Sequence, residues 1–352
     1  MKRKIILSFI VLILSLSSAW AQRGVDLLYV HRGDTIAAAL HGIERTDHLW
    51  QHAGWWNSAN IFEALLDHQR LTGERDSAWC QRVYVANNKR FKGGYQNDYY
   101  DDNAWWALAW IKAFDLYHDK AYIRTAEQIW IDMDRTGRDT VCGGGIVWHP
   151  TKRYKNAITN ELYILLSARL AQRTTDSAAH RMYLASAIND WIWFRNSGML
   201  NKDNLVNDGL TSDCGNNNGT TFTYNQGVIL GGLAELTKLT GDTAYLVTAR
   251  SIAYSAIALL SDSGMILTEP RRERVNADLI QFKGIFVRYL AQLNATLHDP
   301  HISTYLRHNA DSAWVRAHNG HHLYDYYWQG PYVGWTGSGT GAALDLMNAA
   351  VY

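Results

Sequence analysis

Proline is scarce in this sequence, with only 4 among 352 residues. Strict alternation of apolar and polar residues over five or more positions, the pattern of a half-buried strand, is almost absent as well. Apolar residues instead recur at helical spacing along most of the chain. These features exclude a fold built on sheets and predict an all-α architecture.

Neither sign of charge is in excess, because 34 Lys and Arg are balanced by 33 Asp and Glu. The sequence also lacks a block of basic residues, which is the electrostatic footprint of nucleic-acid-binding proteins. We therefore expect no nucleic acid partner.

Cysteine is sparse too, with Cys80, Cys142 and Cys214 as the three in the chain. Their spacing fits no zinc motif, since there is no Cys-x-x-Cys pair and no histidine pair in register. We expect no metal and no other cofactor. An odd number of cysteines allows one disulfide and leaves at least one thiol unpaired, and the sequence does not indicate which two would pair.

Long apolar runs are missing except near the N-terminus. A basic segment at residues 2–4 precedes an apolar one at 5–16, and Ala19-Trp20-Ala21 fits the small-x-small rule of a cleavage site. We expect residues 1–21 to be a cleavable export signal and the mature protein to be periplasmic or secreted. No other stretch approaches the roughly 18 apolar residues of a membrane span. Residues 22–352 suit a single catalytic domain, which we expect to be a monomer.

A tight turn followed by a capping Asp recurs along the chain, at Asp76, Asp119, Asp176, Asp242 and Asp299. The first helices are predicted at residues 34–45 and 48–71. Helical hairpins of this kind bury their apolar faces only by stacking on neighbours. About twelve helices in six hairpins, with tight turns at one end and long polar loops at the other, predict a closed (α/α)6 barrel with its site at the loop-rich end. An open solenoid is the rival fold, but its terminal hairpins would have to be more polar than these.

Two adjacent carboxylates, Asp101 and Asp102, precede an aromatic-rich segment of helical length and so fall at a helix N-terminus. Asp is a favoured residue there, so helix capping alone is one interpretation. Consecutive helical residues also place two carboxyl groups near the separation of about 5–5.5 Å that a retaining glycosidase needs. On these residues alone both interpretations stay open.

Several other segments at helix starts mix aromatic rings with small amides and carboxylates, and the chain is rich in Trp (15) and Tyr (20). Such rings stack on sugars, although core packing or capping explains each residue taken singly. Three glycines at 143–145 would let the backbone approach a ligand closely. As substrate-binding residues we expect Trp56, Asn57, Tyr100, Trp148, Asn160, Asp208, Tyr224, Asn225, Gln226, Lys283 and Phe286.

Taken together, the chain resembles glycoside hydrolase family 76, the endo-acting α-1,6-mannanases. The resemblance is carried, in order along the chain, by residues 101–110, 142–148, 154–162, 207–209, 223–227 and 282–289. It implies an (α/α)6 barrel that cleaves α-1,6-mannosidic linkages in mannan or manno-oligosaccharides with retention. It also implies that Asp101 is the nucleophile and Asp102 the acid/base.

Other functions fit the same residues. A transglycosylase would use the same Asp pair to graft mannan chains, whereas a non-catalytic glycan-binding barrel would use only the aromatic groove. The presence of both aspartates argues against the binding protein. An unsaturated-uronide hydrolase on a similar barrel would need a basic cluster for its carboxylate substrate, and the sequence shows none.

Overall fold

The computed structural model of the chain describes residues 26–91, 94, 96–270 and 275–352. The predicted export signal, residues 1–21, lies outside the described residues. Within them every named element is helical, and the only strand-like pairings are isolated bridges.

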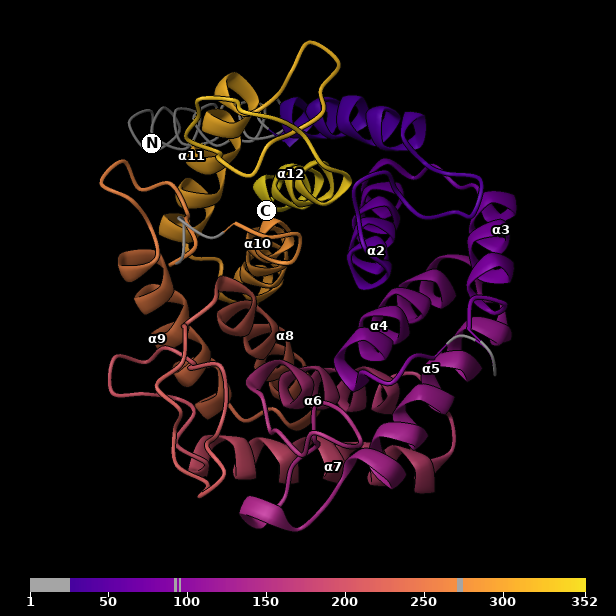
Figure 1. Cartoon of the computed structure of the whole chain (residues 1–352), viewed down its shortest axis with the longest axis vertical. Helices are drawn as coiled ribbons and strands as arrows, with labels where there is room; N and C mark the ends of the chain where they lie inside the picture. Colours follow the sequence, from indigo (N-terminus) through magenta and orange to yellow (C-terminus); the bar gives the residue numbers. More distant parts are fainter. Residues whose placement is uncertain (1–25, 92–93, 95, 271–274) are drawn as a thin grey trace, which may run out of the picture.

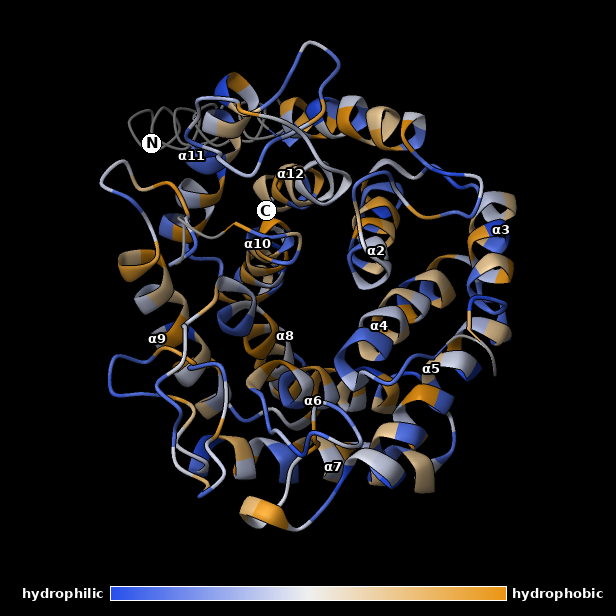
Figure 2. Cartoon of the chain, viewed as in Figure 1, coloured by the Kyte–Doolittle hydropathy of each residue, from blue (hydrophilic) through white to orange (hydrophobic). Residues whose placement is uncertain are grey.

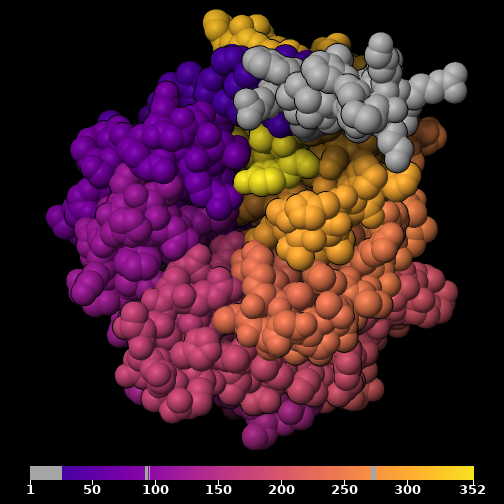
Figure 3. Space-filling view, turned by 180° about the vertical axis from the view of Figure 1, so that it is seen from behind, coloured from indigo at the N-terminus to yellow at the C-terminus, as the bar shows by residue number. Residues whose placement is uncertain are grey.

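Six helices form an inner ring (Figure 1). They are α2 (Trp55–Thr72), α4 (Tyr100–Tyr117), α6 (Ala157–Ala171), α8 (Thr223–Thr240), α10 (Leu279–Leu297) and α12 (Gly337–Ala350). Each packs against the next, and α12 packs against α2, so that the ring is closed. Figure 3 shows the closure from behind, with residues from the two halves of the chain side by side. The predicted (α/α)6 barrel is confirmed, and closure excludes the open solenoid.

The outer ring covers the inner one. It consists of a helix over residues 26–42, then α3 (Ser77–Asn87), α5 (Lys120–Asp132), α7 (Ser177–Asn196), α9 (Ala244–Leu259) and α11 (Pro300–Arg316). Every residue of α6 and α12 is buried, because an inner helix is covered on all sides. Outer helices mix hydrophilic and hydrophobic residues along their length (Figure 2), as expected of helices with one face in solvent. None of the described helices is both long enough and apolar enough to cross a bilayer.

Tight turns join inner helices to the outer helices that follow. Helices α2 and α8 end at Gly73 and Gly241, whose φ values of +80° and +73° lie in the left-handed region that glycine adopts without steric cost. The carboxylate that opens the next helix accepts backbone N–H groups at Asp76, Asp119, Asp176 and Asp299. Four of the five predicted aspartates are thus N-caps, whereas Asp242 precedes Thr243, the N-cap of α9, and accepts the N–H of Ala244. The long connections lie at the opposite, loop-rich end. Two short helical turns, η1 (Met133–Gly137) and η2 (Val141–Gly143), belong to one of these connections.

The first two helices differ from the predicted ranges. They cover residues 26–42 and Trp55–Thr72 instead of 34–45 and 48–71. His48 and His52 have φ values of +58° and +53°, which interrupt any helix between them. Gly54 then forms the N-cap of α2, and its N–H donates to the Asn57 side chain. The apolar periodicity of the sequence continues through this irregular segment, which is why it predicted a helix there.

Near the short-turn end, an ion-pair network fills the centre of the inner ring. Arg288 of α10 donates to Glu63 of α2 at 2.5 Å and to both carboxylate oxygens of Asp345 of α12 at 2.8 and 2.7 Å. Lys112 of α4 and Arg169 of α6 also contact Glu63, at 2.8 and 3.5 Å. Burial acts to raise the pKa of Glu63, but these three cations lower it to about 2. The network thus links five of the inner helices through largely buried charged side chains.

Candidate active site

A pocket of about 400 Å³ opens at the loop-rich end of the barrel, and we call it the aromatic pocket. The starts of five inner helices (α2, α4, α6, α8 and α10) contribute to its wall. Four of the lining side chains are carboxylates, and none of the described lining residues is Lys or Arg. The full lining is Trp56, Tyr99, Asp101, Asp102, Trp105, Trp148, Tyr154, Asn156, Asp208, Tyr224, Asp278 and Phe282.

Asp101 and Asp102 lie in the first turn of α4. The N-cap residue of this helix is Tyr99, and no side chain caps it, so capping does not explain the Asp pair. Because the pair opens the helix, both side chains reach the pocket while the aromatic residues that follow enter the core.

Three N–H groups hold the two carboxylates. Oδ2 of Asp101 accepts a hydrogen bond from Trp148 Nε1 at 2.9 Å, and its Oδ1 accepts one from the backbone N–H of Asp102 at 3.1 Å. Oδ2 of Asp102 accepts a hydrogen bond from Asn97 Nδ2 at 2.7 Å. Burial raises the pKa of Asp102 to about 6. Burial, followed by repulsion from Asp102, raises the pKa of Asp101 well above its usual range. The pair therefore retains one proton near neutral pH, as one acid beside one carboxylate.

Stacked aromatic rings form part of the pocket wall. The rings of Tyr224 and Phe282 lie parallel, with centroids 3.8 Å apart. Trp56 stacks on Trp105 at 6.1 Å, and its indole N–H donates to Asp278 Oδ1 at 3.0 Å. Rings fixed in this way offer preformed apolar faces for pyranose rings.

Asp208 lies on the connection before α8 and is held by the Tyr154 hydroxyl, which donates to its Oδ2 at 2.5 Å. Asn217 Nδ2 in turn donates to that hydroxyl at 2.8 Å. One carboxylate oxygen is thus fixed to a loop side chain. The position of Asp208 in the wall makes it an acceptor for ligand hydroxyl groups.

The structure brings only some of the predicted site residues to the pocket. Besides the aspartate pair, these are Trp56, Trp148, Asp208 and Tyr224. The other predicted substrate-binding residues do not line it and are at most 3% exposed: Asn57, Tyr100, Asn160, Asn225, Gln226, Lys283 and Phe286.

Several of these buried residues hold the loops that shape the pocket. Asn160 bonds to the backbone N and O of Ile146, and Gln226 does the same at Val206. The Lys283 ammonium donates to the backbone carbonyl of Tyr326 at 2.6 Å and lies over that residue's ring. Their polar atoms thus serve the framework behind the pocket.

Sequence reasoning missed six of the lining residues: Tyr99, Trp105, Tyr154, Asn156, Asp278 and Phe282. A signal existed for one of them. Trp105 follows the predicted Asp101 by four residues, which places both on one helix face.

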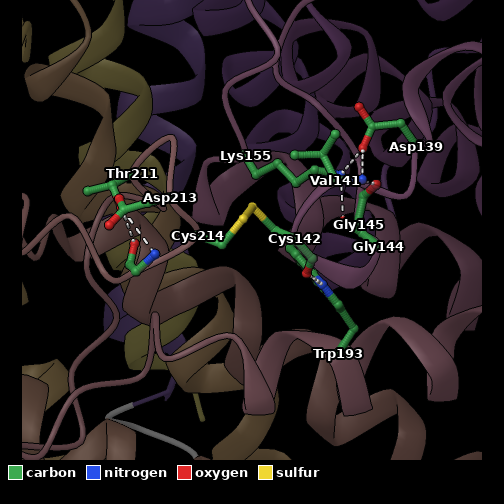
Figure 4. Close-up of a disulfide and its surroundings, with 11 residues drawn as sticks. Asp139, Val141, Cys142, Gly144, Gly145, Lys155, Trp193, Thr211, Asp213 and Cys214 are labelled. Carbon is green, nitrogen blue, oxygen red and sulfur yellow. Dashed lines mark hydrogen bonds and ion pairs between the residues drawn. A yellow bond between two sulfur atoms is a disulfide. The ribbon is translucent and has the colours of Figure 1, made fainter.

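A disulfide between Cys142 and Cys214 joins two loops that carry pocket residues (Figure 4). Cys80 is a buried free thiol. The expectation of one disulfide with one thiol left over is therefore confirmed, and the pairing that sequence left open is resolved.

The glycines of residues 143–145 serve the loop itself. A Cβ added to Gly145 would lie 2.4 Å from the Trp193 ring, and the φ of this residue is +80°. Lys155 Nζ donates to the Gly145 carbonyl at 3.0 Å and pairs with Asp139 at 2.6 Å. Gly144 and Gly145 leave room for the Trp193 ring, and none of the three glycines lines the aromatic pocket.

Replacing both Cys142 and Cys214 with Ser is expected to lower the free energy of unfolding by about 4 kcal/mol, because the cross-link constrains the unfolded chain. The bridged cysteines are separated by 72 residues. Urea unfolding measures the difference, with Cys80→Ser as the control for loss of a thiol alone. Equal stability of the double variant and the native chain would contradict the prediction.

Glu161, the fifth residue of α6, is fully buried, and neither carboxyl oxygen has a hydrogen-bond partner among the described residues. Burial, and then the charge of Asp208, raises the pKa of Glu161 well above its usual range. The folded protein thus keeps this proton, whereas the unfolded chain loses it above a pH of about 4.3.

Stability should therefore fall by up to about 1.4 kcal/mol per pH unit above that value until the folded pKa is reached. Glu161→Gln removes this dependence, so its stability relative to the native chain should rise between pH 5 and pH 8 in urea unfolding. The exposed Glu74→Gln is the control. A stability difference that does not change with pH would show that Glu161 is ionised in the folded protein.

A closed helical barrel whose loop-rich end holds paired carboxylates between aromatic walls is the arrangement of a helical-barrel glycoside hydrolase. The model of glycosyl hydrolase family 76 matches residues 36–351, and the chain belongs to this family.

Curated relatives include the mannan endo-1,6-alpha-mannosidase DFG5 of Candida albicans, 25% identical over 267 residues, with 67% of this chain and 57% of the relative covered. A putative mannan endo-1,6-alpha-mannosidase of Schizosaccharomyces pombe is 26% identical over 278 residues, covering 71% of this chain and 61% of the relative. The chain thus spans about three-fifths of the length of these two fungal relatives.

Solved structures share the fold. The GH76A alpha-1,6-mannanase of Salegentibacter sp. HEL1_6 superposes with a TM-score of 0.81 at 23% identity, covering 92% of this chain and 98% of that one. An inactive variant of that mannanase, with two consecutive aspartates replaced, was solved in complex with alpha-1,6-mannotetrose. It superposes with a TM-score of 0.83 at 22% identity, with the same coverage.

Proposed function

We propose that the protein is an endo-acting glycoside hydrolase that cleaves α-1,6-mannosidic linkages in mannan backbones and manno-oligosaccharides. The observation that carries the proposal is the proton-sharing pair Asp101 and Asp102 in the aromatic pocket. Support for the substrate comes from the fungal relatives named mannan endo-1,6-alpha-mannosidases and from the Salegentibacter mannanase. Replacement of two consecutive aspartates inactivated the latter.

The reaction proceeds in two steps with retention. Asp101 attacks the anomeric carbon of a mannose unit, while Asp102 gives its proton to the departing O6, so that the C1–O6 bond breaks as a C1–carboxylate bond forms. Asp102 then removes a proton from water, and the water oxygen attacks C1 and releases Asp101. Each aspartate ends the cycle in its starting protonation state.

Pocket residues beside the pair bind the sugar chain in this proposal. The rings of Trp56 and Tyr224 stack on mannose units, and Asp208 and Asp278 accept hydrogen bonds from hydroxyl groups. The described lining offers no Lys or Arg to select an anionic sugar, which suits a neutral mannan.

We also propose that residues 1–21 direct export, that residues 22–352 act as one catalytic domain and that the mature enzyme works as a monomer without a cofactor. The basic, apolar and small-x-small order of residues 2–21 supports the export signal. N-terminal sequencing of exported protein should give Gln22 as the first residue. An intact Met1 in the exported fraction would contradict cleavage.

The decisive experiment is incubation with linear α-1,6-mannan, with product lengths followed over time and the first-formed anomer identified by NMR. An endo-acting, retaining enzyme gives a ladder of intermediate oligosaccharides with α reducing ends. Products longer than an added manno-oligosaccharide acceptor would indicate transglycosylation, and binding without turnover would indicate a glycan-binding barrel. Turnover of another glycan, with none of α-1,6-mannan, would overturn the substrate.

A further inference from the structure

We infer that Trp148 and Asn97 are positioning residues that fix the division of labour in the pair, holding Asp101 as the carboxylate and Asp102 as the acid. The inference rests on the proposed retaining mechanism. It gives Trp148 a different role from the sugar-stacking role expected from sequence, and it assigns a role to Asn97, which sequence reasoning did not single out.

The Trp148 indole is fixed with its N–H edge toward Asp101. Its backbone N–H donates to the carbonyl of Tyr154 at 2.7 Å, and its carbonyl accepts the N–H of Tyr100, the first residue of α4, at 3.2 Å. Lys152 Nζ lies 4.5 Å from the ring centroid, and the Tyr99 ring packs against it at 4.9 Å. With the ring packed in this way, the contact of Trp148 with the catalytic pair is its 2.9 Å bond to Asp101.

The orientation of the Asn97 amide follows from its other bonds. Asn97 Oδ1 accepts the backbone N–H of Tyr99 at 2.9 Å, so the NH₂ group must be the end that faces Asp102. Asn103 holds the backbone of Asn97 through two further bonds, at 3.0 and 2.9 Å. The donor to Asp102 is therefore built into the segment that leads into α4.

The two carboxylates receive unequal numbers of donors. N–H groups stabilise an ionised carboxylate more than a protonated one. Among the described residues, Asp101 accepts two such bonds, one on each oxygen, whereas Asp102 accepts one, on Oδ2. Oδ1 of Asp102 accepts no hydrogen bond from a described residue and is available for the shared proton. By this difference in donors, the negative charge is better stabilised on Asp101 and the proton on Asp102.

Burial, and then repulsion from Asp102, raises the pKa of Asp101, so the division of charge depends on the donors and on one further carboxylate. Asp278, at the start of α10, repels charge on Asp102 and so favours its protonated form. The other titratable or charged groups near the pair in the described part of the chain are Glu161 on α6, Tyr224 on α8, and Tyr99, Lys152, Tyr154 and Asp208 on the loops.

The pH profile of kcat/KM on α-1,6-mannan tests the inference, because its acidic limb reports ionisation of the nucleophile and its alkaline limb reports loss of the acid's proton. Trp148→Phe removes one N–H donor from Asp101. We expect the acidic limb to move up by about one pH unit and kcat to fall about tenfold, with KM nearly unchanged. Substituting β-(3-benzothienyl)alanine at position 148 removes only the N–H and should give the same shift if the Phe variant folds poorly.

Asn97→Ser keeps a hydroxyl acceptor for the Tyr99 N–H and removes the amide donor to Asp102 without adding charge. We expect the alkaline limb to move up by about one pH unit while the acidic limb stays in place. The two variants therefore act on opposite limbs, which a general loss of packing would not produce.

Trp130→Phe is the matched control, since it removes a buried indole hydrogen bond to Ser167 at 2.7 Å, outside the aromatic pocket. Its stability should fall while both limbs stay in place. Unmoved limbs in the Trp148 and Asn97 variants, or shifts on the opposite limbs, would overturn the inference. Absence of turnover by the native enzyme on α-1,6-mannan would instead reject the proposed function.

Discussion

Replacing Asp101 with Asn is expected to lower kcat on α-1,6-mannan by about 10⁴-fold or more, because an amide cannot form the covalent glycosyl-enzyme. Asp102→Asn should cost about 10²- to 10⁴-fold on mannan, where the leaving O6 needs a proton. On an aryl α-mannoside with a good leaving group, the first step of the Asp102 variant should survive. Burst kinetics with that substrate would then show the intermediate accumulating.

Azide separates the two roles further, since it attacks without needing a general base. D102A should form α-mannosyl azide from the β-linked intermediate, whereas D101A should form β-mannosyl azide by direct displacement. The exposed Asp203→Asn is the control and should retain native turnover. The same azide anomer from both variants would refute the separate roles of nucleophile and acid.

Replacing Arg288 with Met is expected to lower the free energy of unfolding by about 3–5 kcal/mol, because it leaves Glu63 and Asp345 buried with less compensation. All three side chains are at most 5% exposed. Urea unfolding at neutral pH measures the loss. Lys202→Met is the matched control, because the side chains of Lys202 and its partner Asp203 are 89% and 55% exposed. This variant should change the free energy of unfolding by less than about 0.5 kcal/mol.

A double variant makes this prediction sharper. Asp345→Leu combined with Arg288→Met removes the stranded carboxylate, while Glu63 keeps Lys112 and Arg169 as partners. The double variant should therefore be more stable than Arg288→Met alone. A double variant less stable than the single one would show that Asp345 contributes chiefly by packing.

The sequence predicts the barrel because its signals are local. A tight turn such as that at Gly73, followed by Asp76, reports backbone geometry within a few residues, and the repetition of that joint implies stacking. The Asp101–Asp102 pair was equally accessible, because its neighbours define a helix start. Between His48 and Gly54 the apolar periodicity predicted the second helix to begin too early. A pattern of apolar residues does not reveal which residues have a left-handed backbone conformation.

The pocket wall was harder to predict because the same polar side chains can form hydrogen bonds with a sugar or with the protein backbone. An amide such as Asn160 can satisfy a mannose hydroxyl or the peptide group of Ile146, and only the fold decides which one it meets. Asp278 lies far along the sequence from Asp102, so their proximity is a property of ring closure. The bond between Cys142 and Cys214 likewise depends on two loops that meet only in three dimensions.

The five inner helices that begin at the aromatic pocket have a consequence for its electrostatic potential. Peptide dipoles aligned along each helix place a partial positive charge, equivalent to about half an elementary charge, at its N-terminus. Five such ends converge on four carboxylates, with no described Lys or Arg among the lining. The backbone thereby offsets the repulsion among the four carboxylates. It does so without side-chain cations, which would pair with the carboxylates and compete with sugar hydroxyl groups for them. The potential of a helix end falls off within the first turn, so it stabilises the carboxylates at the helix starts. The middle of the pocket remains negative, which favours the positive charge of an oxocarbenium-like transition state.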